Sequence, residues 1–500
     1  MKDNGASLRM GILRQAADQQ IVKPMQTHGW DAHIISEVMP GEYIIIEGRR
    51  LGVRRSVALL YSSATDNAYY RTLDATVDAI FTNGALYMIE SFAQGISKPV
   101  KPVDEFFSTL VEWNKALGPQ AAIRPPHAPK VILRLTAEKP IDAIWARLER
   151  LASVRLAAKI VERRWNREET LQPKTLKAKA EGVAYSVRSG VEYFRRSDGE
   201  SLSRRIVSLY YGVIALASAE MLASPSGPSD LDEVEGFTKA GHGLYALTSA
   251  GDELGTLKVG VLSRGFYPNW VNFLGGDVSG YPKQKAGSDS DLARLDATTH
   301  STMAGLFSSI PELGDLFLEI FNQEPSWVIP HSDMDANGAL SGFRAAREAG
   351  ATYIRLLDAS GRVSQARLES AGWPLAEITP VQDEDGQSTF RARVDHVGYS
   401  TWHGAVPIHY SPFLASGALI LPGLAGAEAY RTNALVVLYA LSIAVRYLPS
   451  IWRRVEGGDS DQYLILVRTA IEIFERVLPE AFLESITGEH IVARQPGSFT

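Results

Sequence analysis

Residues 201–222 read SLSRRIVSLYYGVIALASAEML and predict a long helix that is buried over much of its surface. Apolar and small residues recur there at the three- and four-residue spacing of a helical face. The stretches LVVLYALSIAVRYLPSIW (435–452) and SDQYLILVRTAIEIFERVLP (460–479) have the same character. The most apolar run, 434–448, is about 15 residues long and contains Arg446, whereas a membrane span needs about 20. These helices therefore predict the core of a helical bundle and no membrane partner.

The composition is that of an ordinary globular protein. The chain has 500 residues, 45% of them hydrophobic and 22% charged, and a formal net charge of −6. This length predicts two to four domains, since a domain typically has about 100–200 residues. The absence of cysteine excludes disulfides, Cys-ligated zinc and a Cys nucleophile. The first twenty residues lack the apolar core of a signal peptide, so we expect a cytoplasmic protein.

The N-terminal part, 1–185, is predicted to be a mixed α/β domain. A domain boundary is placed in the polar segment 168–185, which carries Pro173. The segment GRRLGVRR (48–55) is predicted to be a hairpin loop between two short strands. The helices predicted in this part are 8–28, broken near Pro24, and 65–81, 103–117 and 141–167. The predicted strands are 32–38, 42–47, 56–62, 86–91 and 131–136.

The C-terminal part, 186–500, is predicted to be mainly helical. Glycine and proline punctuate residues 224–290, which argues against regular helix there. Further helices are predicted at 302–307, 312–321, 429–448 and 461–477. Strand-like alternation at 352–359, 362–370 and 389–397 predicts a β-containing insertion around 350–400. The expected fold class is therefore α+β.

The C-terminal part resembles the YaaC-like family of bacterial proteins over roughly residues 190–485. The residues that carry the resemblance are SLYYGVIALASAEML (208–222), KAGHGL (239–244), SSIPELGDLFLEIF (308–321) and the helix pair quoted above. The resemblance implies a fold more than an activity. Its opening helices are similar to HEPN-type helical domains, which occur in bacterial defence proteins and RNA-cleaving toxins. Residues 1–185 lie outside it and loosely resemble a restriction-endonuclease-like fold.

Two nuclease hypotheses follow from these resemblances. A restriction-like nuclease needs acidic groups around Mg²⁺, and Asp31, Glu47 and Arg49 are the candidates for an altered catalytic motif. Mg²⁺ is expected only under this hypothesis, and otherwise we expect no cofactor. A HEPN-type ribonuclease would use an Arg followed four to six residues later by His. Arg294 with His300 and Arg391 with His396 match that spacing, as often as chance would produce.

Basic residues form clusters that suit phosphate contact, although each cluster can equally be a solvated, ion-paired surface. The candidate nucleic-acid-binding residues are Arg49, Arg50, Arg54, Arg55, Arg147, Arg150, Arg155, Lys159, Arg163, Arg195, Arg196, Arg204 and Arg205. His242 lies between two glycines in GHGL. It either faces a ligand or hydrogen-bonds a turn, and the structural role is favoured. His403 and His409 are expected to be structural, and no metal site is predicted.

The preferred hypothesis is therefore an accessory or scaffold protein of a bacterial anti-phage defence system. It would bind DNA, RNA or a partner protein, and it would form homo-oligomers through its helical part. A Mg²⁺-dependent nuclease and a HEPN-type ribonuclease remain as alternatives. The protein is expected to be non-enzymatic unless one of these nuclease hypotheses holds.

Overall fold

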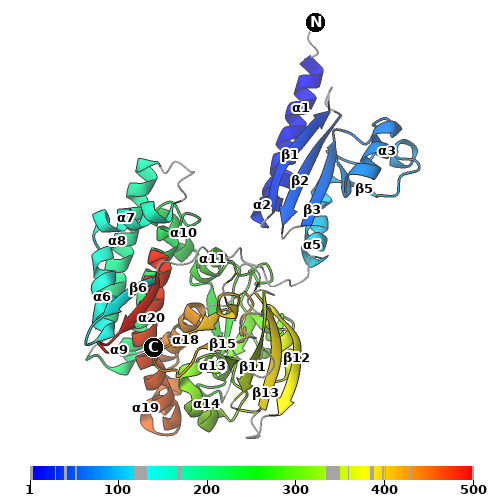
Figure 1. Ribbon diagram of the computed structural model, residues 1–500. Coiled ribbons are helices and arrows are strands. Elements are labelled where there is room, and N and C mark those ends of the chain that lie inside the picture. Colours follow the sequence, from blue (N-terminus) through cyan, green and yellow to red (C-terminus); the bar gives the residue numbers. More distant parts are fainter. Residues whose placement is uncertain are drawn as a thin grey trace. The chain divides into compact units, whose positions relative to one another are not determined.

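A five-stranded sheet organises the N-terminal part in a computed structural model of the protein (Figure 1). Its strands are β1 (Asp31–Val38), β2 (Tyr43–Arg50), β3 (Val53–Leu60), β4 (Ala79–Thr82) and β5 (Val100–Pro102). They lie in chain order. The first three are antiparallel, and β4 and β5 continue the sheet in parallel. The basic segment 48–55 therefore belongs mostly to β2 and β3, which corrects the prediction of a long hairpin loop.

The structure describes residues 4–28, 30–38, 42–50, 53–116, 132–165, 172–196, 199–249, 251–333, 350–358, 360–382, 388–396, 399, 401–426 and 430–497.

Two apolar layers cover the N-terminal sheet because successive side chains of a strand point to opposite faces. Ile44, Ile46, Val57 and Leu59 pack in one core with the first helical segment and α5, while Ala58 belongs to a second core with α3. The helical elements are α1 (Asn4–Ala17), η1 (Asp18–Val22), α2 (Lys23–Thr27), α3 (Asn67–Thr76), α4 (Ile89–Phe92), η2 (Val103–Glu105) and α5 (Phe106–Ala116).

The helix 8–28 was predicted to break near Pro24, and the regular α-helix is interrupted there by the π-helical η1, which directly precedes α2 and its Pro24. Two other N-terminal predictions are corrected. The predicted helix 65–81 ends at Thr76 because the apolar residues that follow form β4. The predicted strand 86–91 overlaps α4 instead.

The chain divides into two compact units at Met1–Pro125 and Pro126–Thr500. The polar segment that was predicted to be the boundary lies inside the second unit. Its residues from Pro173 onward begin the long helix α8 (Pro173–Arg196). The predicted helix 141–167 is two helices, α6 (Pro140–Leu151) and α7 (Val154–Arg164).

A helical bundle forms the largest core of the second unit, and its central helix is the quoted one, α9 (Leu202–Ala223). α9 packs against α8, α18 (Tyr430–Tyr447) and α20 (Asp461–Thr487), and α19 (Pro449–Gly457) links the last two. Among the described helices, α9 alone is long and apolar enough to cross a membrane by itself. Since 72% of its apolar window is buried inside the protein, it is a core helix.

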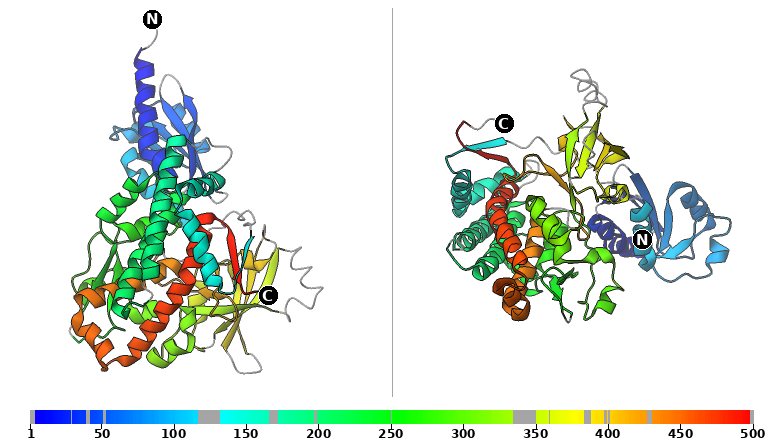
Figure 2. Two further views of the ribbon diagram at one scale, coloured as in Figure 1. Left: turned by 90° about the vertical axis from the view of Figure 1, so that its left-hand side faces the viewer. Right: turned by 90° about the horizontal axis from the view of Figure 1, so that it is seen from below.

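Two smaller sheets complete the bundle. β6 (Ile132–Thr136) pairs in parallel with the last strand, β16 (His490–Arg494), so both ends of this unit meet there (Figure 2). A three-stranded sheet is formed by β7 (Leu244–Leu247), β8 (Lys258–Val261) and β9 (His300–Thr302). The helical elements in this part of the chain are α10 (Leu231–Lys239), α11 (Phe266–Phe273), α12 (Asp289–Leu292), η3 (Ala297–Thr299), α13 (Met303–Phe307), η4 (Pro311–Leu313) and α14 (Gly314–Phe321). The prediction that 224–290 contains no regular helix is therefore wrong.

The predicted β insertion is a six-stranded antiparallel sheet with an apolar core of its own. Its order is β12 (Leu375–Gln382), β13 (Ser388–Asp395), β11 (Ala351–Asp358), β10 (Trp327–Ser332), β15 (Ala418–Ile420) and β14 (Ile408–His409). The sheet thus extends beyond 350–400 on both sides. The predicted strand 362–370 contains a short helix, α17 (Gln365–Glu369), because the Ser364 side chain caps its first turn. A further turn, η5 (Trp402–Gly404), precedes β14.

Candidate functional site

An aromatic surface surrounds the GHG turn of the helical bundle. We call it the tyrosine surface. It consists of Tyr193 on α8, Tyr210 and Tyr211 on α9, His242 in the turn, and Tyr439, Arg446 and Tyr447 on α18. Tyr210 and Tyr439, which are 229 positions apart in the chain, meet here because α9 packs against α18, and α8 brings Tyr193 to Tyr211.

The turn that carries His242 is held rigidly. Gly241 and Gly243 have φ of +105° and +75°, a backbone conformation that side chains disfavour. The amides of Phe266 and Tyr267, at the start of α11, donate hydrogen bonds to Gly241 O (2.9 Å) and His242 O (3.0 Å). A side chain on Gly243 would also collide with Pro268, because its Cβ would lie 2.2 Å from the ring. The GHG sequence therefore fixes the position of His242.

The imidazole of His242 lies against two tyrosines. Its Nδ1 is 2.7 Å from the Tyr210 hydroxyl, and its ring centroid is 5.7 Å from those of both Tyr210 and Tyr439. The Tyr439 hydroxyl donates to Leu244 O at 3.0 Å. Partial burial, together with the nearby Arg446 guanidinium, lowers the pKa of His242, so the imidazole is neutral at pH 7. The imidazole thus connects the turn to α9 through Tyr210, while His242 as a residue is exposed at the surface.

Arg446 supplies positive charge to the tyrosine surface. Its Nε and Nη2 donate to Ser442 O (3.0 Å) and Ser442 Oγ (3.2 Å), and its guanidinium lies 5.0 Å from the Tyr447 ring centroid. No acidic partner of Arg446 is found among the residues that the structure describes. The exposed rings are Tyr447 and Tyr193, and Tyr193 stacks on Tyr211 with centroids 5.8 Å apart. Exposed rings beside an arginine without a carboxylate can stack on planar groups and contact anions.

The N-terminal candidate residues form an ion-paired cluster instead. Glu47 is buried and contacts Arg49 (2.9 Å) and Arg54 (2.6 Å), and Arg55 pairs with Asp78 at 3.1 Å. Burial alone would raise the pKa of Glu47, but the two guanidinium groups outweigh it and hold the pKa below its usual value.

The sheet register places Asp31 opposite Arg49 on the neighbouring strand, so the structure brings the three proposed catalytic residues together. The remaining arginine of segment 48–55, Arg50, is the last residue of β2. The Glu47 carboxylate is occupied by arginines, and no group of three metal-ligating side chains occurs within the described ranges. The Glu47 carboxylate is thus held in an ion-paired cluster, with Oε1 near Arg49 and Oε2 near Arg54.

Three residues of the other basic clusters serve as ion-pair partners. Arg163 contacts Glu489 (2.7 Å), Arg195 contacts Glu149 (3.0 Å) and Arg205 contacts Glu475 (2.5 Å). Five residues have no recorded acidic partner in the described part of the chain, namely Arg147, Arg150, Arg155, Lys159 and Arg204. The side chain of Arg196 lies outside the described residues. The predicted clusters are thus partly neutralised, and the remaining charge lies mainly on α6 and α7.

In one of the two spacing-based Arg–His pairs, both side chains contact other residues. Arg391 is bound to Asp333 at 2.6 Å, while His396 is buried and its Nε2 lies 2.8 Å from Thr352 Oγ1. Arg294 is highly exposed at the end of α12, and His300 begins β9. His409 is engaged by Glu312 and Tyr430, in agreement with its predicted structural role.

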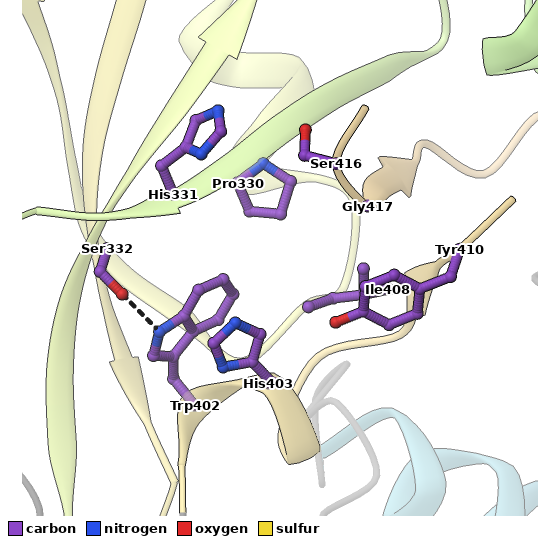
Figure 3. Close-up of a pocket in the computed structure, with 9 residues that line it drawn as sticks. All are labelled: Pro330, His331, Ser332, Trp402, His403, Ile408, Tyr410, Ser416 and Gly417. Atoms are coloured by element: carbon purple, nitrogen blue, oxygen red, sulfur yellow. Dashed lines mark hydrogen bonds between the residues drawn. The ribbon is translucent and has the colours of Figure 1, made fainter. Parts of the chain in front are cut away.

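A pocket of about 270 Å³ lies at the edge of the six-stranded sheet (Figure 3). It is bounded by the end of β10, by η5 and by the β14–β15 hairpin. Trp402 and His403 form one wall, and Ile408 and Tyr410 form the opposite one. No local sequence pattern indicates this pocket, because its walls come from segments about 70 residues apart.

Comparison with known proteins identifies one relationship. No curated protein and no solved structure shows significant similarity to the chain. The family model described as "YaaC-like Protein" matches residues 149–486. The match begins inside α6, well before the residue 190 at which the sequence resemblance was placed. It covers α7 to α20 and the six-stranded sheet between them, and the chain therefore belongs to the YaaC-like family.

Proposed function

We propose that this YaaC-like protein is a non-catalytic accessory protein that binds single-stranded nucleic acid on the tyrosine surface. One observation carries the proposal: Arg446 lies beside the exposed Tyr447 ring and is bound to Ser442 rather than to a carboxylate. Binding of single strands combines a cation for the phosphates with ring faces on which bases stack. The tyrosine surface supplies both.

The fold is compatible with this role. The cations of α6 and α7 without a recorded acidic partner would extend the electrostatic attraction beyond the tyrosine surface. The order of helix, three antiparallel strands, helix and parallel strand in the N-terminal unit supports a restriction-endonuclease-like arrangement whose candidate carboxylate, Glu47, is taken up by arginines. A chain that combines a HEPN-type bundle with a nuclease-like unit would suit an accessory protein of bacterial defence.

Fluorescence anisotropy with a labelled oligonucleotide tests the proposal. Single-stranded RNA, single-stranded DNA and duplex DNA would each be titrated at about 50 mM and about 200 mM salt, because phosphate contacts weaken steeply over this range. We expect single strands to bind at low salt and to bind several-fold less tightly to Tyr447→Ala. Tyr87→Ala is the matched control, since Tyr87 is equally exposed (64% for both side chains) and lies in the other unit.

Two outcomes would overturn the proposal. One is the absence of binding to every strand at low salt. The other is equal binding by the wild type and Tyr447→Ala. If the protein binds a partner protein and no nucleic acid, the experiment would give the first of these outcomes. Addition of Mg²⁺ is expected to leave the RNA and a plasmid uncut, and cleavage that disappears in Glu47→Gln would restore the nuclease hypothesis.

A further inference from the structure

The pocket at the sheet edge has a built aromatic wall. Trp402 is buried and its Nε1 donates to Ser332 Oγ at 3.0 Å, so the indole is fixed to β10. His403 stacks on Trp402, with ring centroids 3.8 Å apart and planes inclined by 25°. Figure 3 shows His403 on the side of Trp402 that faces Tyr410 across the pocket. A flat ring that entered the pocket would therefore meet a stack that is already formed.

The opposite wall depends on a glycine. A Cβ on Gly417 would lie 2.3 Å from Ile408 Cγ2 and 2.9 Å from Tyr410 Cε1. Any side chain at this position would therefore displace the two residues that face the Trp402–His403 stack. Because Gly417 leaves them in place, the gap between the two walls stays open.

The lining of the pocket is polar and carries no formal charge at neutral pH, as far as the structure describes it. None of the described lining residues is Asp, Glu, Lys or Arg. Burial lowers the pKa of His403, which keeps that imidazole neutral at pH 7. The hydroxyls of Tyr410 and Ser416 and the ring of His331 can exchange hydrogen bonds with a ligand. This lining favours a planar, uncharged ligand with several donors and acceptors, and it offers no fixed cation to a phosphate.

We propose that this pocket binds one planar heteroaromatic ring of the nucleobase class, inserted between His403 and Tyr410. Its volume of about 270 Å³ lies just below the roughly 300–1,000 Å³ of ordinary ligand pockets, which suits one base better than a dinucleotide. The ring could belong to a free nucleoside or to a base turned out of a nucleic-acid strand. The pocket is independent of the tyrosine surface, because its residues come from the six-stranded sheet.

Saturation-transfer NMR and calorimetry with adenosine, guanosine, cytidine and uridine test this inference on the full chain. We expect saturable binding of at least one nucleoside, weakened about tenfold or more by His403→Ala and largely retained by His403→Phe, because an aromatic stack contributes about 1–3 kcal/mol. His33→Ala is the control, since His33 is exposed on β1 of the other unit. Unchanged thermal unfolding of the variants would show that they fold.

A further measurement, the oligonucleotide affinity of His403→Ala, distinguishes a free nucleoside from a base within a nucleic-acid strand. If the natural ligand is a free nucleoside, His403→Ala would weaken nucleoside binding and leave oligonucleotide affinity unchanged. A base within a strand would instead make oligonucleotide affinity fall in His403→Ala. The absence of saturable binding of every nucleoside at millimolar concentration, together with unchanged oligonucleotide binding by His403→Ala, would overturn the inference. Much tighter binding of a nucleoside monophosphate than of the nucleoside would also contradict it, since the described lining residues offer no fixed cation to a phosphate.

Discussion

The imidazole of His409 stacks on the phenol ring of Tyr430, with centroids 4.1 Å apart and planes inclined by only 12°. Both side chains also reach the buried Glu312 carboxylate, His409 through Nε2 at 2.7 Å and Tyr430 through its hydroxyl at 3.3 Å. β14 thus presents Ile408 to the pocket and His409 to α18. This contact attaches the six-stranded sheet to the helical bundle.

Loss of His409 is expected to destabilise this attachment. His409→Ala removes the stack and leaves Glu312 buried without its main partner, which we expect to lower the unfolding free energy by about 2–4 kcal/mol. Thermal and urea unfolding would measure the effect, with the exposed His33→Ala as the control. A loss no larger than that of His33→Ala would show that the contact contributes nothing to stability.

Arg164 stabilises the end of the last helix rather than contributing a free charge. Its Nη1 donates to Ser485 O (2.6 Å) and Ile486 O (2.8 Å), two carbonyls in the last turn of α20. Arg164→Ala would leave these carbonyls without that donor, so we expect a loss of about 1–3 kcal/mol in unfolding free energy. Arg155→Ala, an exposed site on the same helix, should change stability by less than about 0.5 kcal/mol. Equal effects of the two substitutions would refute the capping role.

Lys179 makes stability depend on pH. It is buried, and its Nζ donates to Ser224 O (2.9 Å), Gly227 O (3.1 Å) and Pro228 O (2.7 Å). Burial lowers the pKa of Lys179 from 10.5 to about 8. Between these two pKa values the unfolded chain binds more protons than the folded one, so this lysine's contribution to stability rises with pH there and falls as pH drops toward 8.

Comparison of the wild type with Lys179→Met isolates that contribution. We subtract the unfolding free energy of Lys179→Met from that of the wild type. We expect this value to become more positive by about 1–2 kcal/mol between about pH 8 and pH 10. Lys177→Met is the matched control, since Lys177 lies on the same helix and is largely exposed. A difference that is flat over this range, or that shrinks, would contradict a lowered pKa for Lys179.

The sequence was most informative where one helix buries one continuous apolar surface. α9, α18 and α20 lie close to their predicted positions because the spacing of their apolar residues matches the helix face that is buried in the bundle core. Short elements were misassigned where a cap or a neighbouring strand decides the outcome. Ser364 turns a strand-like segment into α17, and β16 is a strand because it pairs with β6, more than 350 residues earlier. Such tertiary partners are not encoded in local spacing.

For the basic clusters too, local sequence does not reveal the tertiary partners, here the acidic residues that pair with the arginines. Arg163 belongs to an apparently free basic run, yet it pairs with Glu489, 326 residues away in the sequence. In the sequence, Arg446 is only a charge that interrupts an apolar helix. In the structure, it supplies the cation of the tyrosine surface. His242 could be singled out because its flanking glycines mark a fixed turn. The sequence pattern thus predicts the fixed position of His242, but it does not predict which basic side chains lack an acidic partner.

The two parts of the tyrosine surface should affect nucleic-acid binding in different ways. Arg446→Gln removes one phosphate contact, so the plot of log affinity against log salt should become shallower by roughly 0.7–0.9. Tyr447→Ala removes a stacking face and should lower affinity by about 1–3 kcal/mol at every salt concentration, with the slope unchanged. Arg14→Gln, an exposed arginine of the N-terminal unit, serves as the charge control. If Arg446→Gln and Arg14→Gln gave the same slope, binding would reflect general electrostatic attraction, and Arg446 would have no direct phosphate contact.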